Sequence, residues 1–209
     1  DETNFSVLVE TTDSDLVNYA RSDGFDILFT DSSGTTILDY EREYYDYSTG
    51  ELVAWVEADI SSTTDTDIYI YYGNSGATID SAVTAGAWDS DYMGIWHLSE
   101  NVVDDSSQVD VHEDSTINDN DGDQYGNNEK VGMFYQGQDF DGVNDYIEID
   151  DDNSLDMIDA LSLGFWIKGT LTNPPSASTS IYASAGTDSF VVPDGVTEIS
   201  VKVWGGGGG

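Results

Sequence analysis

The sequence has no cysteine and very few basic residues. Without cysteine, the chain can form neither a disulfide framework nor a cysteine-based metal or redox centre. It contains 5 Lys plus Arg against 42 Asp plus Glu, which gives a formal net charge of −37. A surface this acidic repels phosphate, so we expect no nucleic acid and no bare anionic lipid as partners. The sequence also has no run of about 18 apolar residues, so we expect no direct membrane insertion.

The acid excess has three interpretations, which are a solvation shell suited to high salt, sites for divalent cations, and plain solubility. Salt screens the self-repulsion of such a chain, because the Debye length falls to roughly 3 Å at 1 M. The charge therefore favours a salt-adapted, halophilic source, and calcium binding is compatible with it.

Apolar residues make up 38% of the chain and aromatic residues 12%, which is too much for a disordered acidic tail. Apolar and polar residues alternate in short runs bounded by Gly, Asn, Asp and Ser, which predicts β-strands. The segment Asp13 to Ser22 is the one short helix we expect, with Asp13 or Ser14 as its cap. The predicted strands are Phe5 to Glu10, Asp26 to Thr30, Leu52 to Ala58, Asp67 to Tyr72, Gly94 to Leu98, Asp145 to Ile149, Ser162 to Lys168 and Ile199 to Trp204.

The spacing of strands and turns predicts an all-β fold built from immunoglobulin-like or jelly-roll β-sandwich domains, the second of them incomplete. Small residues near Thr78 to Asp89 and the Ser, Thr, Ala and Pro-rich stretch Leu171 to Thr187 mark the boundaries. The expected parts are a β-sandwich domain at 1–80, a connector at 81–92, a partial jelly roll at 93–170, a linker at 171–188 and a terminal strand with a glycine-rich tail at 189–209.

Two stretches in the first part carry a specific pattern. They are Asp-Gly-Phe-Asp-Ile-Leu-Phe-Thr-Asp at residues 23–31 and Tyr-Tyr-Gly-Asn at residues 71–74. Together with Trp55-Val56-Glu57 they resemble a domain family of unassigned function in large secreted and surface proteins of archaea and bacteria. The resemblance covers roughly residues 1–80 and implies an extracellular, cell-surface location.

The second part is similar to the beginning of a concanavalin A-like, laminin-G-type jelly roll. The similarity rests on Gly94 to Glu100, on Asp114-Ser115-Thr116, on Phe140 to Ile149 and on Leu161 to Lys168. Such a domain has about a dozen strands, and the pattern here stops after Lys168.

The last predicted strand alternates, with Ile199, Val201, Val203 and Trp204 as its apolar residues. A sandwich that lacks a strand exposes an unpaired edge, which another chain can fill. This strand is therefore a candidate donor to the first domain of a neighbouring copy, in an assembled fibre. The other interpretation is that the sequence is a fragment of a larger adhesin, and the two stay open.

We expect no enzyme activity. Glu148-Ile149-Asp150-Asp151-Asp152 is close to the Glu-Ile-Asp-x-Glu pattern of retaining endoglucanases, but Asp152 stands where a second Glu is needed. The same residues fit a jelly-roll edge strand and turn. His97 and His112 lack a nucleophile pattern or metal-ligand spacing, and His97 alternates with its apolar neighbours, so a structural role is expected.

Calcium is the candidate cofactor. Hard cations bind six to eight oxygen ligands on a tight loop, and the sequence supplies carboxylates densely around residues 114–123. The loop resembles an EF-hand start but lacks the Glu at the twelfth position and the flanking helices. A solvated acidic loop is the alternative. The candidate metal ligands are Asp114, Asp119, Asp121, Asp123, Asp141 and Asp145.

Glycans are a further candidate partner. Tyr44, Tyr45 and Tyr47 lie close together on a strand and cannot all face one core, so they form a candidate carbohydrate-binding cluster. Tyr69, Tyr71 and Trp55 alternate and are expected in the interior or in cross-strand pairs.

The sequence thus predicts an extracellular structural or adhesive protein of the cell surface, an adhesin or filament subunit whose partners are other copies of itself or other surface proteins. The alternative is the carbohydrate-binding region of a larger secreted enzyme.

Overall fold

The computed structural model describes residues 1–82, 86–156 and 161–168. The chain divides into two units, Asp1–Ser154 and Leu155–Gly209, and the elements below belong to the first unit apart from the last residue of the final short helix. The strands are β1 (Glu2–Thr12), β2 (Leu28–Thr30), β3 (Ile37–Leu38), β4 (Tyr40–Asp46), β5 (Glu51–Ile60), β6 (Tyr69–Tyr71), β7 (Ser107–His112), β8 (Gly122–Tyr125), β9 (Asn128–Val131), β10 (Gln136–Asp139) and β11 (Tyr146–Ile149). The helices are α1 (Ser14–Tyr19) and the short 3-10 helix η2 (Asn153–Leu155), and no helix in the described ranges is long and apolar enough to span a membrane.

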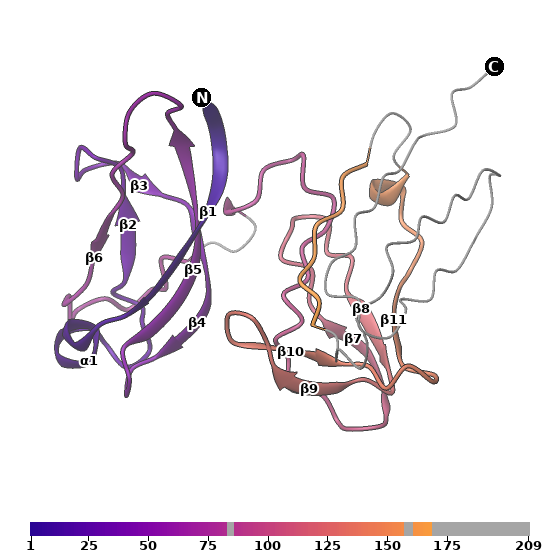
Figure 1. The fold of residues 1–209 in the computed structure, drawn as a ribbon. Helices are drawn as coiled ribbons and strands as arrows, with labels where there is room; N and C mark the ends of the chain where they lie inside the picture. Colours follow the sequence, from indigo (N-terminus) through magenta and orange to yellow (C-terminus); the bar gives the residue numbers. More distant parts are fainter. Residues whose placement is uncertain (83–85, 157–160, 169–209) are drawn as a thin grey trace, which may run out of the picture. The chain divides into compact units, whose positions relative to one another are not determined.

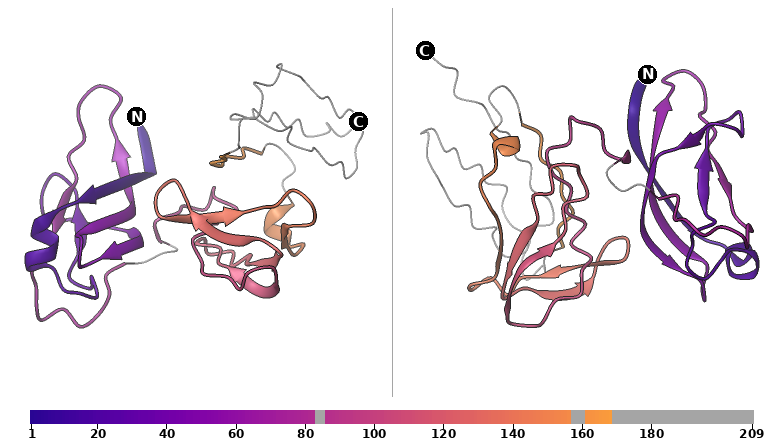
Figure 2. Two further views of the ribbon diagram at one scale, coloured as in Figure 1. Left: turned by 60° about the horizontal axis from the view of Figure 1, so that its bottom comes forward. Right: turned by 180° about the vertical axis from the view of Figure 1, so that it is seen from behind.

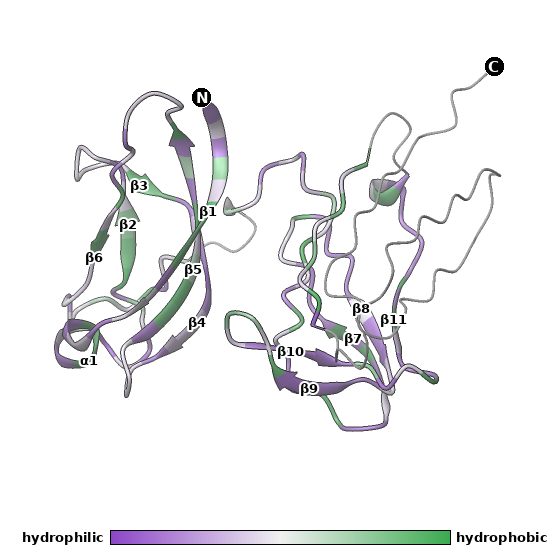
Figure 3. Cartoon of the chain, in the orientation of Figure 1, coloured by the Kyte–Doolittle hydropathy of each residue, from purple (hydrophilic) through white to green (hydrophobic). Residues whose placement is uncertain are grey.

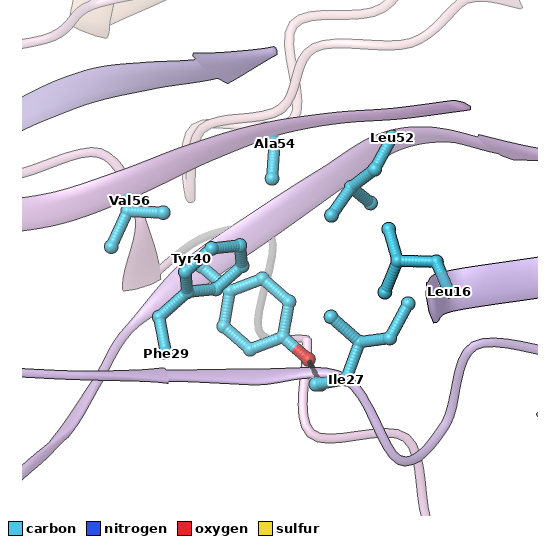
Figure 4. Close-up of a cluster of buried hydrophobic side chains, with 7 residues drawn as sticks. All are labelled: Leu16, Ile27, Phe29, Tyr40, Leu52, Ala54 and Val56. Atoms are coloured by element: carbon cyan, nitrogen blue, oxygen red, sulfur yellow. Dashed lines mark hydrogen bonds between the residues drawn. The ribbon is translucent and has the colours of Figure 1, made fainter. Parts of the chain in front are cut away.

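The first eighty residues form two antiparallel sheets, with strand orders β1-β5-β4 and β3-β2-β6 (Figures 1 and 2). The hydrophobic core joins them. Phe29 of β2 meets Tyr40 of β4 edge to face, with ring centroids 5.0 Å apart. Figure 4 shows the cluster, whose buried members are Leu16, Ile27, Phe29, Tyr40, Leu52, Ala54 and Val56. The fold class predicted from alternation, all-β, is confirmed.

Tyr40 is a polar group inside this core. Its side chain is fully buried, and its hydroxyl donates a hydrogen bond to the backbone carbonyl of Ile27. Burial raises the pKa of Tyr40 to about 12, so the hydroxyl stays protonated and can donate. The core therefore contains a polar atom without leaving it unsatisfied.

Strand β5 is buried on both of its faces. Leu52, Ala54 and Val56 lie in the core, while Val53 on the opposite face is also fully buried. A strand covered on both sides needs a nearly continuous apolar run, which residues 52–58 provide. Figure 3 shows this run as green along β5, in contrast to the hydrophilic β9. Something must therefore cover the outer face of the β1-β5-β4 sheet.

The predicted helix is confirmed as α1. The Asp13 side chain accepts a hydrogen bond from the backbone N–H of Asp15 and so caps the helix, as the sequence indicates. Leu16 is the buried residue of this short helix, and the backbone N–H of Asp13 donates to the carbonyl of Gly50 at 3.0 Å. Gly50 has a φ of +75°, and a Cβ there would stand 2.0 Å from the Asp13 carbonyl oxygen, so only glycine fits.

The specific pattern at residues 23–31 has a structural explanation. Asp26 is buried, and its carboxylate accepts hydrogen bonds from the backbone N–H of Arg21 at 2.9 Å and of Gly73 at 2.7 Å. Asp26 thus ties the start of β2 to the end of β6. The carboxylate of Asp23 forms an ion pair with Arg21, whose hydrogen bond lowers the pKa of Asp23 to about 2.

Residues 86–154 contain the sheet β11-β8-β7 and the hairpin β10-β9. The strand predicted at Asp145 to Ile149 is confirmed as β11. The strand predicted at Gly94 to Leu98 is wrong, because this segment makes an isolated bridge from Trp96 to Asp114 and no ladder. Ser162 to Lys168 also forms no strand. The alternation there has no neighbouring ladder to join, and alternation alone does not make a strand.

Candidate functional site

The outer face of the β1-β5-β4 sheet carries two glutamates. In the register of β4 and β5, Glu41 lies opposite Trp55 and Tyr44 lies opposite Val53, with a bulge between Arg42 and Tyr44. Glu43 is the extra residue of that bulge. Directly opposed residues share a face, so the bulge turns Glu41 and Tyr44 outward while Arg42 points to the core side. There the Arg42 guanidinium forms an ion pair with the Asp80 carboxylate and donates a hydrogen bond of 3.0 Å to the backbone carbonyl of Gly24.

His97 lies between the two glutamates. Its Nε2 atom is 3.0 Å from Oε2 of Glu41, and its Nδ1 atom is 3.3 Å from Oε2 of Glu43. The indole N–H of Trp55 donates to the same Glu43 oxygen at 2.7 Å. The ring of His97 also stacks near that of Trp55, with centroids 5.9 Å apart. We call Glu41, Glu43 and His97 the acid–histidine cluster.

Glu41 is the centre of this cluster. It is 6% exposed, and its two carboxylate oxygens accept three hydrogen bonds, from His97 and from two further donors. Trp88 Nε1–H donates at 2.7 Å and the Ser115 hydroxyl at 2.8 Å. A buried carboxylate needs such donors, because an unpaired charge in the interior is strongly unfavourable.

The environment of His97 acts on its pKa in two opposite directions. Burial alone lowers the pKa of the imidazole, because the charged form loses its hydration. The hydrogen bond to Glu41 and the negative charges of Glu41, Glu43 and Glu100 more than offset this loss. The net result is a pKa of His97 raised above its usual value.

His112 is the second structural histidine. It is fully buried, with Nδ1 at 2.9 Å from Oε2 of Glu100 and Nε2 at 3.1 Å from the side-chain amide of Asn127. The Asn127 amide also donates to Gln138 at 2.9 Å, so its NH₂ group faces His112 and the His112 Nε2 atom accepts. Nδ1 therefore carries the proton that is donated to Glu100. The expected structural role of both histidines agrees with these contacts.

The predicted calcium ligands lie in two separate loops. Asp114 is buried, and its two carboxylate oxygens accept four hydrogen bonds, from Ile95, Asn120 and the N–H and hydroxyl of Thr116. Two bonds on each oxygen occupy the lone pairs that a cation would need.

The other predicted ligands also bind backbone. Asp121 accepts from the N–H of Asp114 and Asp123 from that of Asp110, each at 2.8 Å. Asp141 and Asp145 belong to another turn, in which the Asp145 carboxylate accepts from the Asp141 N–H at 2.8 Å. Asp119 is exposed, with a positive φ of 58°. Across the described ranges, no three His, Cys, Asp or Glu side chains form a group that could hold a metal ion. Calcium binding stays a prediction.

The predicted sugar-binding tyrosines point in different directions. Tyr44 stacks on Tyr135, with ring centroids 3.7 Å apart. Tyr45 packs against the core, and Tyr47 is 57% exposed on its own. Adjacent residues of a strand point to opposite faces, and the bulge between Arg42 and Tyr44 makes Tyr44 the outward one of the pair.

A different pair of tyrosines forms an exposed surface. Tyr69 and Tyr71 are each 46% exposed on β6, so they do not lie in the interior, which was one of the two expectations. They lie opposite Thr30 and Leu28 of β2, on one face of the sheet, which agrees with the other expectation, that of cross-strand pairs. Ile37 of β3 lies opposite Thr30 on the same face. The inward side chain between them is Ile70, which packs against the core. The alternation Tyr-Ile-Tyr was a correct sign of a strand, and which face was buried could not be read from it.

The remaining candidates lie at the surface or outside the described residues. Glu148, Asp150 and Asp152 are exposed, and Glu148 is opposite Asp123 in the register of β11 and β8. The predicted assembly strand, with Ile199, Val201, Val203 and Trp204, lies outside the described residues.

The acid–histidine cluster was not predicted from the sequence. Glu41 and Glu43 are two of many acidic residues in a chain that is acidic throughout, so no local signal distinguishes them. The rarity of cations was the available signal, since only two histidines accompany five Lys and Arg.

The comparisons with known proteins agree with the resemblance of the first part. Searches of the curated proteins and of the solved structures gave no match. Residues 23–91 match the model of one family, described as a domain of unknown function, DUF2341. The matched range includes Glu41, Glu43, Trp55 and Trp88, and the chain therefore carries a segment similar to this family over residues 23–91.

Proposed function

We propose that this protein is an extracellular structural or adhesive subunit that assembles with copies of itself by β-strand addition along β1. The observation that carries the proposal is the open edge of β1. This strand is 11 residues long and, among the described strands, pairs with β5 alone. A long edge strand presents a row of backbone N–H and C=O groups that a further strand can bind.

The side chains of β1 support pairing with an apolar strand. Phe5 is 48% exposed near the beginning of β1, where it pairs with Ala58 next to the shift in register between Glu2 and Phe5. A strand added along this edge would cover the ring and remove apolar surface from water. The alternating segment Ile199 to Trp204 suits this role, and its Lys202 would face an edge strand that carries Glu2 and Glu10.

The net charge makes the proposed assembly dependent on salt. Two chains that each carry a net charge of −37 repel each other in dilute buffer. At 1 M salt the Debye length is roughly 3 Å, so only charges in direct contact still interact. We expect assembly at molar salt and dissociation on dilution.

Negative-stain electron microscopy at molar KCl tests the proposal, with regular fibres as the expected result. Phe5→Asp should abolish the fibres, because it places a charge on the open edge. Tyr47→Asp adds the same charge at an exposed position away from β1 and should leave them intact. Monomers of the wild type under all salt conditions would rule out assembly. Addition of a chelator tests in the same samples whether calcium contributes.

Cross-linking identifies the donor strand. The chain has no cysteine, so two single-cysteine proteins, Thr3→Cys and Ser200→Cys, can be mixed under oxidising conditions. Strand donation predicts a mixed disulfide dimer, whereas Tyr47→Cys, at an exposed position after β4, in place of Thr3→Cys should give none. Fibres that form without the mixed dimer would support self-assembly but rule out Ile199 to Trp204 as the donor strand.

The second candidate function is carbohydrate binding, and the exposed tyrosines of β6 favour it. Tyr69 and Tyr71 lie on one face, about 6.8 Å apart along the strand, and flat aromatic rings stack on the apolar faces of sugars. Affinity electrophoresis with neutral polysaccharides tests this. Retardation that Tyr69→Ala and Tyr71→Ala abolish, and Tyr47→Ala does not, would establish it.

A further inference from the structure

The outer face of the β1-β5-β4 sheet is covered by residues of the predicted connector and of the segment after it. Ala87 and Trp88 are buried there, and the Ser6 hydroxyl of β1 donates to the carbonyl of Ala87. Trp88 lies near Trp55 of β5, with ring centroids 5.3 Å apart. Further along the covering segment, His97 and Ser115 reach Glu41 of β4. The contacts thus extend across the whole sheet, from β1 to β4.

The polar contacts between the sheet and this segment converge on the acid–histidine cluster. A carboxylate only accepts hydrogen bonds, and both ring nitrogens of His97 face a carboxylate oxygen. A neutral imidazole has one N–H, so it can donate to Glu41 or to Glu43 but not to both. The doubly protonated imidazolium, in contrast, presents an N–H to each of the two carboxylates.

We propose that the acid–histidine cluster is a proton-dependent latch that fastens the segment from Ala87 to Ser115 onto the outer face of the β1-β5-β4 sheet. With the proton present, one positive charge bridges two buried negative charges. When His97 loses a proton, one glutamate faces a nitrogen lone pair, and two carboxylates remain buried with no cation between them. The segment is then released, and Trp55 and Trp88 become accessible to water.

The charged groups around His97 all act in the same direction. Glu41 and Glu43 face it from β4, and Glu100 acts on it from the covering segment. Trp55 on β5, together with Trp88 and Ser115 on the segment, contributes neutral donors to the two carboxylates. Arg42, although it lies between the two glutamates in sequence, points to the other side of the sheet. His97 is thus the one cationic side chain that these contacts place in the cluster.

The direction of the pH dependence follows from the raised pKa of His97. A group whose pKa is raised in the closed state stabilises that state fully below its ordinary value of about 6.5. The stabilisation is lost as the pH rises through the raised value. The latch is therefore closed below the ordinary pKa of histidine and opens as the pH rises through the raised pKa of His97. Between the two pKa values, the opening equilibrium constant rises by about tenfold per pH unit, because a single proton is released.

The indole N–H groups of Trp55 and Trp88 report on the latch directly, because they donate to Glu43 and Glu41. The rate at which these N–H protons exchange with solvent can be measured by NMR from pH 6 to pH 10. The exchange rate of a tryptophan peptide at the same pH, divided by the rate in the protein, gives the protection of each indole. We expect both indoles to be protected at pH 6 and to lose up to about tenfold of protection per pH unit above the ordinary histidine pKa. The ring resonance of His97 gives a second NMR signal of the latch. It should titrate with the same midpoint as the loss of indole protection.

Three variants separate a latch from a merely structural contact. His97→Gln provides no charge, so the indoles should exchange quickly at every pH. Glu43→Gln keeps an acceptor for Trp55 and removes one of the negative charges that raise the pKa of His97, so the pH dependence should be weaker than in the wild type. Glu10→Gln removes an exposed charge of β1 and should reproduce the wild-type curve.

Two results would overturn the proposal. One is constant protection of both indoles in the wild type from pH 6 to pH 10. The other is a Glu43→Gln curve that follows the wild-type curve. The measurement is made on the monomer, so its outcome is independent of whether fibres form.

Discussion

The deletion of the Glu41 side chain is the most direct test of how the outer face of the sheet is held. Glu41 is 6% exposed and accepts hydrogen bonds from Trp88, His97 and Ser115. In Glu41→Ala all three donors lose their acceptor in a buried site. An unsatisfied buried donor costs about 1–3 kcal/mol, and removal of one partner of a buried ion pair costs about 3–5 kcal/mol.

These costs overlap, because the same donors are counted in both, so we expect Glu41→Ala to lower the free energy of unfolding by about 4 kcal/mol. In a unit of this size, each kcal/mol shifts the melting temperature by about 2–4 °C, which gives a shift of about 8–16 °C. Glu41→Gln keeps an acceptor oxygen and nearly the same volume. Its cost should be smaller, about 1–2 kcal/mol, since the amide oxygen can still accept from Trp88 and His97 and the Ser115 hydroxyl can accept from the new N–H.

Urea denaturation at a fixed molar concentration of KCl, followed by tryptophan fluorescence, measures these differences. Urea is preferred to guanidinium because it leaves the ionic strength unchanged. The matched control is Glu10→Ala, which removes an exposed carboxylate from β1, at the other edge of the same sheet, and should stay within about 0.5 kcal/mol of the wild type. A Glu41→Ala variant within about 1 kcal/mol of the wild type would refute the reasoning, because three buried donors cannot lose their acceptor at so small a cost.

Three further predictions concern the sandwich and its charge. Tyr40→Phe leaves the carbonyl of Ile27 without its donor and should cost about 1–3 kcal/mol in urea denaturation, whereas Tyr47→Phe at the surface should cost nothing measurable. Gly50→Ala and Gly142→Ala each place an alanine at a positive φ, which costs about 1–2 kcal/mol of stability. Only Gly50→Ala also forces a Cβ to 2.0 Å from a backbone oxygen, so this variant should lose a further amount of about 1–3 kcal/mol relative to Gly142→Ala. Equal losses for the two glycine variants would contradict the close approach. The melting temperature should rise steadily between about 0.1 M and 2 M KCl, because the Debye length shrinks from about 10 Å to less than about 3 Å and the acidic side chains repel each other less. A melting temperature that does not change with KCl would show that self-repulsion does not limit stability.

The sequence by itself determined the fold class and most strands of the first part. Alternation at Leu52 to Ala58 and Asp67 to Tyr72 predicted β5 and β6, and an aspartate before Leu16 predicted the capped helix α1. These signals are local, since side-chain alternation and N-terminal capping depend on residues close together in the chain. The same locality made the prediction of a strand at Gly94 to Leu98 wrong, because a strand exists only with a partner.

The tertiary structure decided which faces are buried and which charges meet. The bulge at Glu43 shifts the alternation of β4, so Tyr45 faces the core and Tyr44 the outer face, the reverse of what regular alternation from Tyr40 predicts. The approach of His97 to Glu41 joins residues that are 56 positions apart. In a chain with 42 acidic residues, only that long-range packing decides which carboxylates are removed from water, and therefore which of them need a cation.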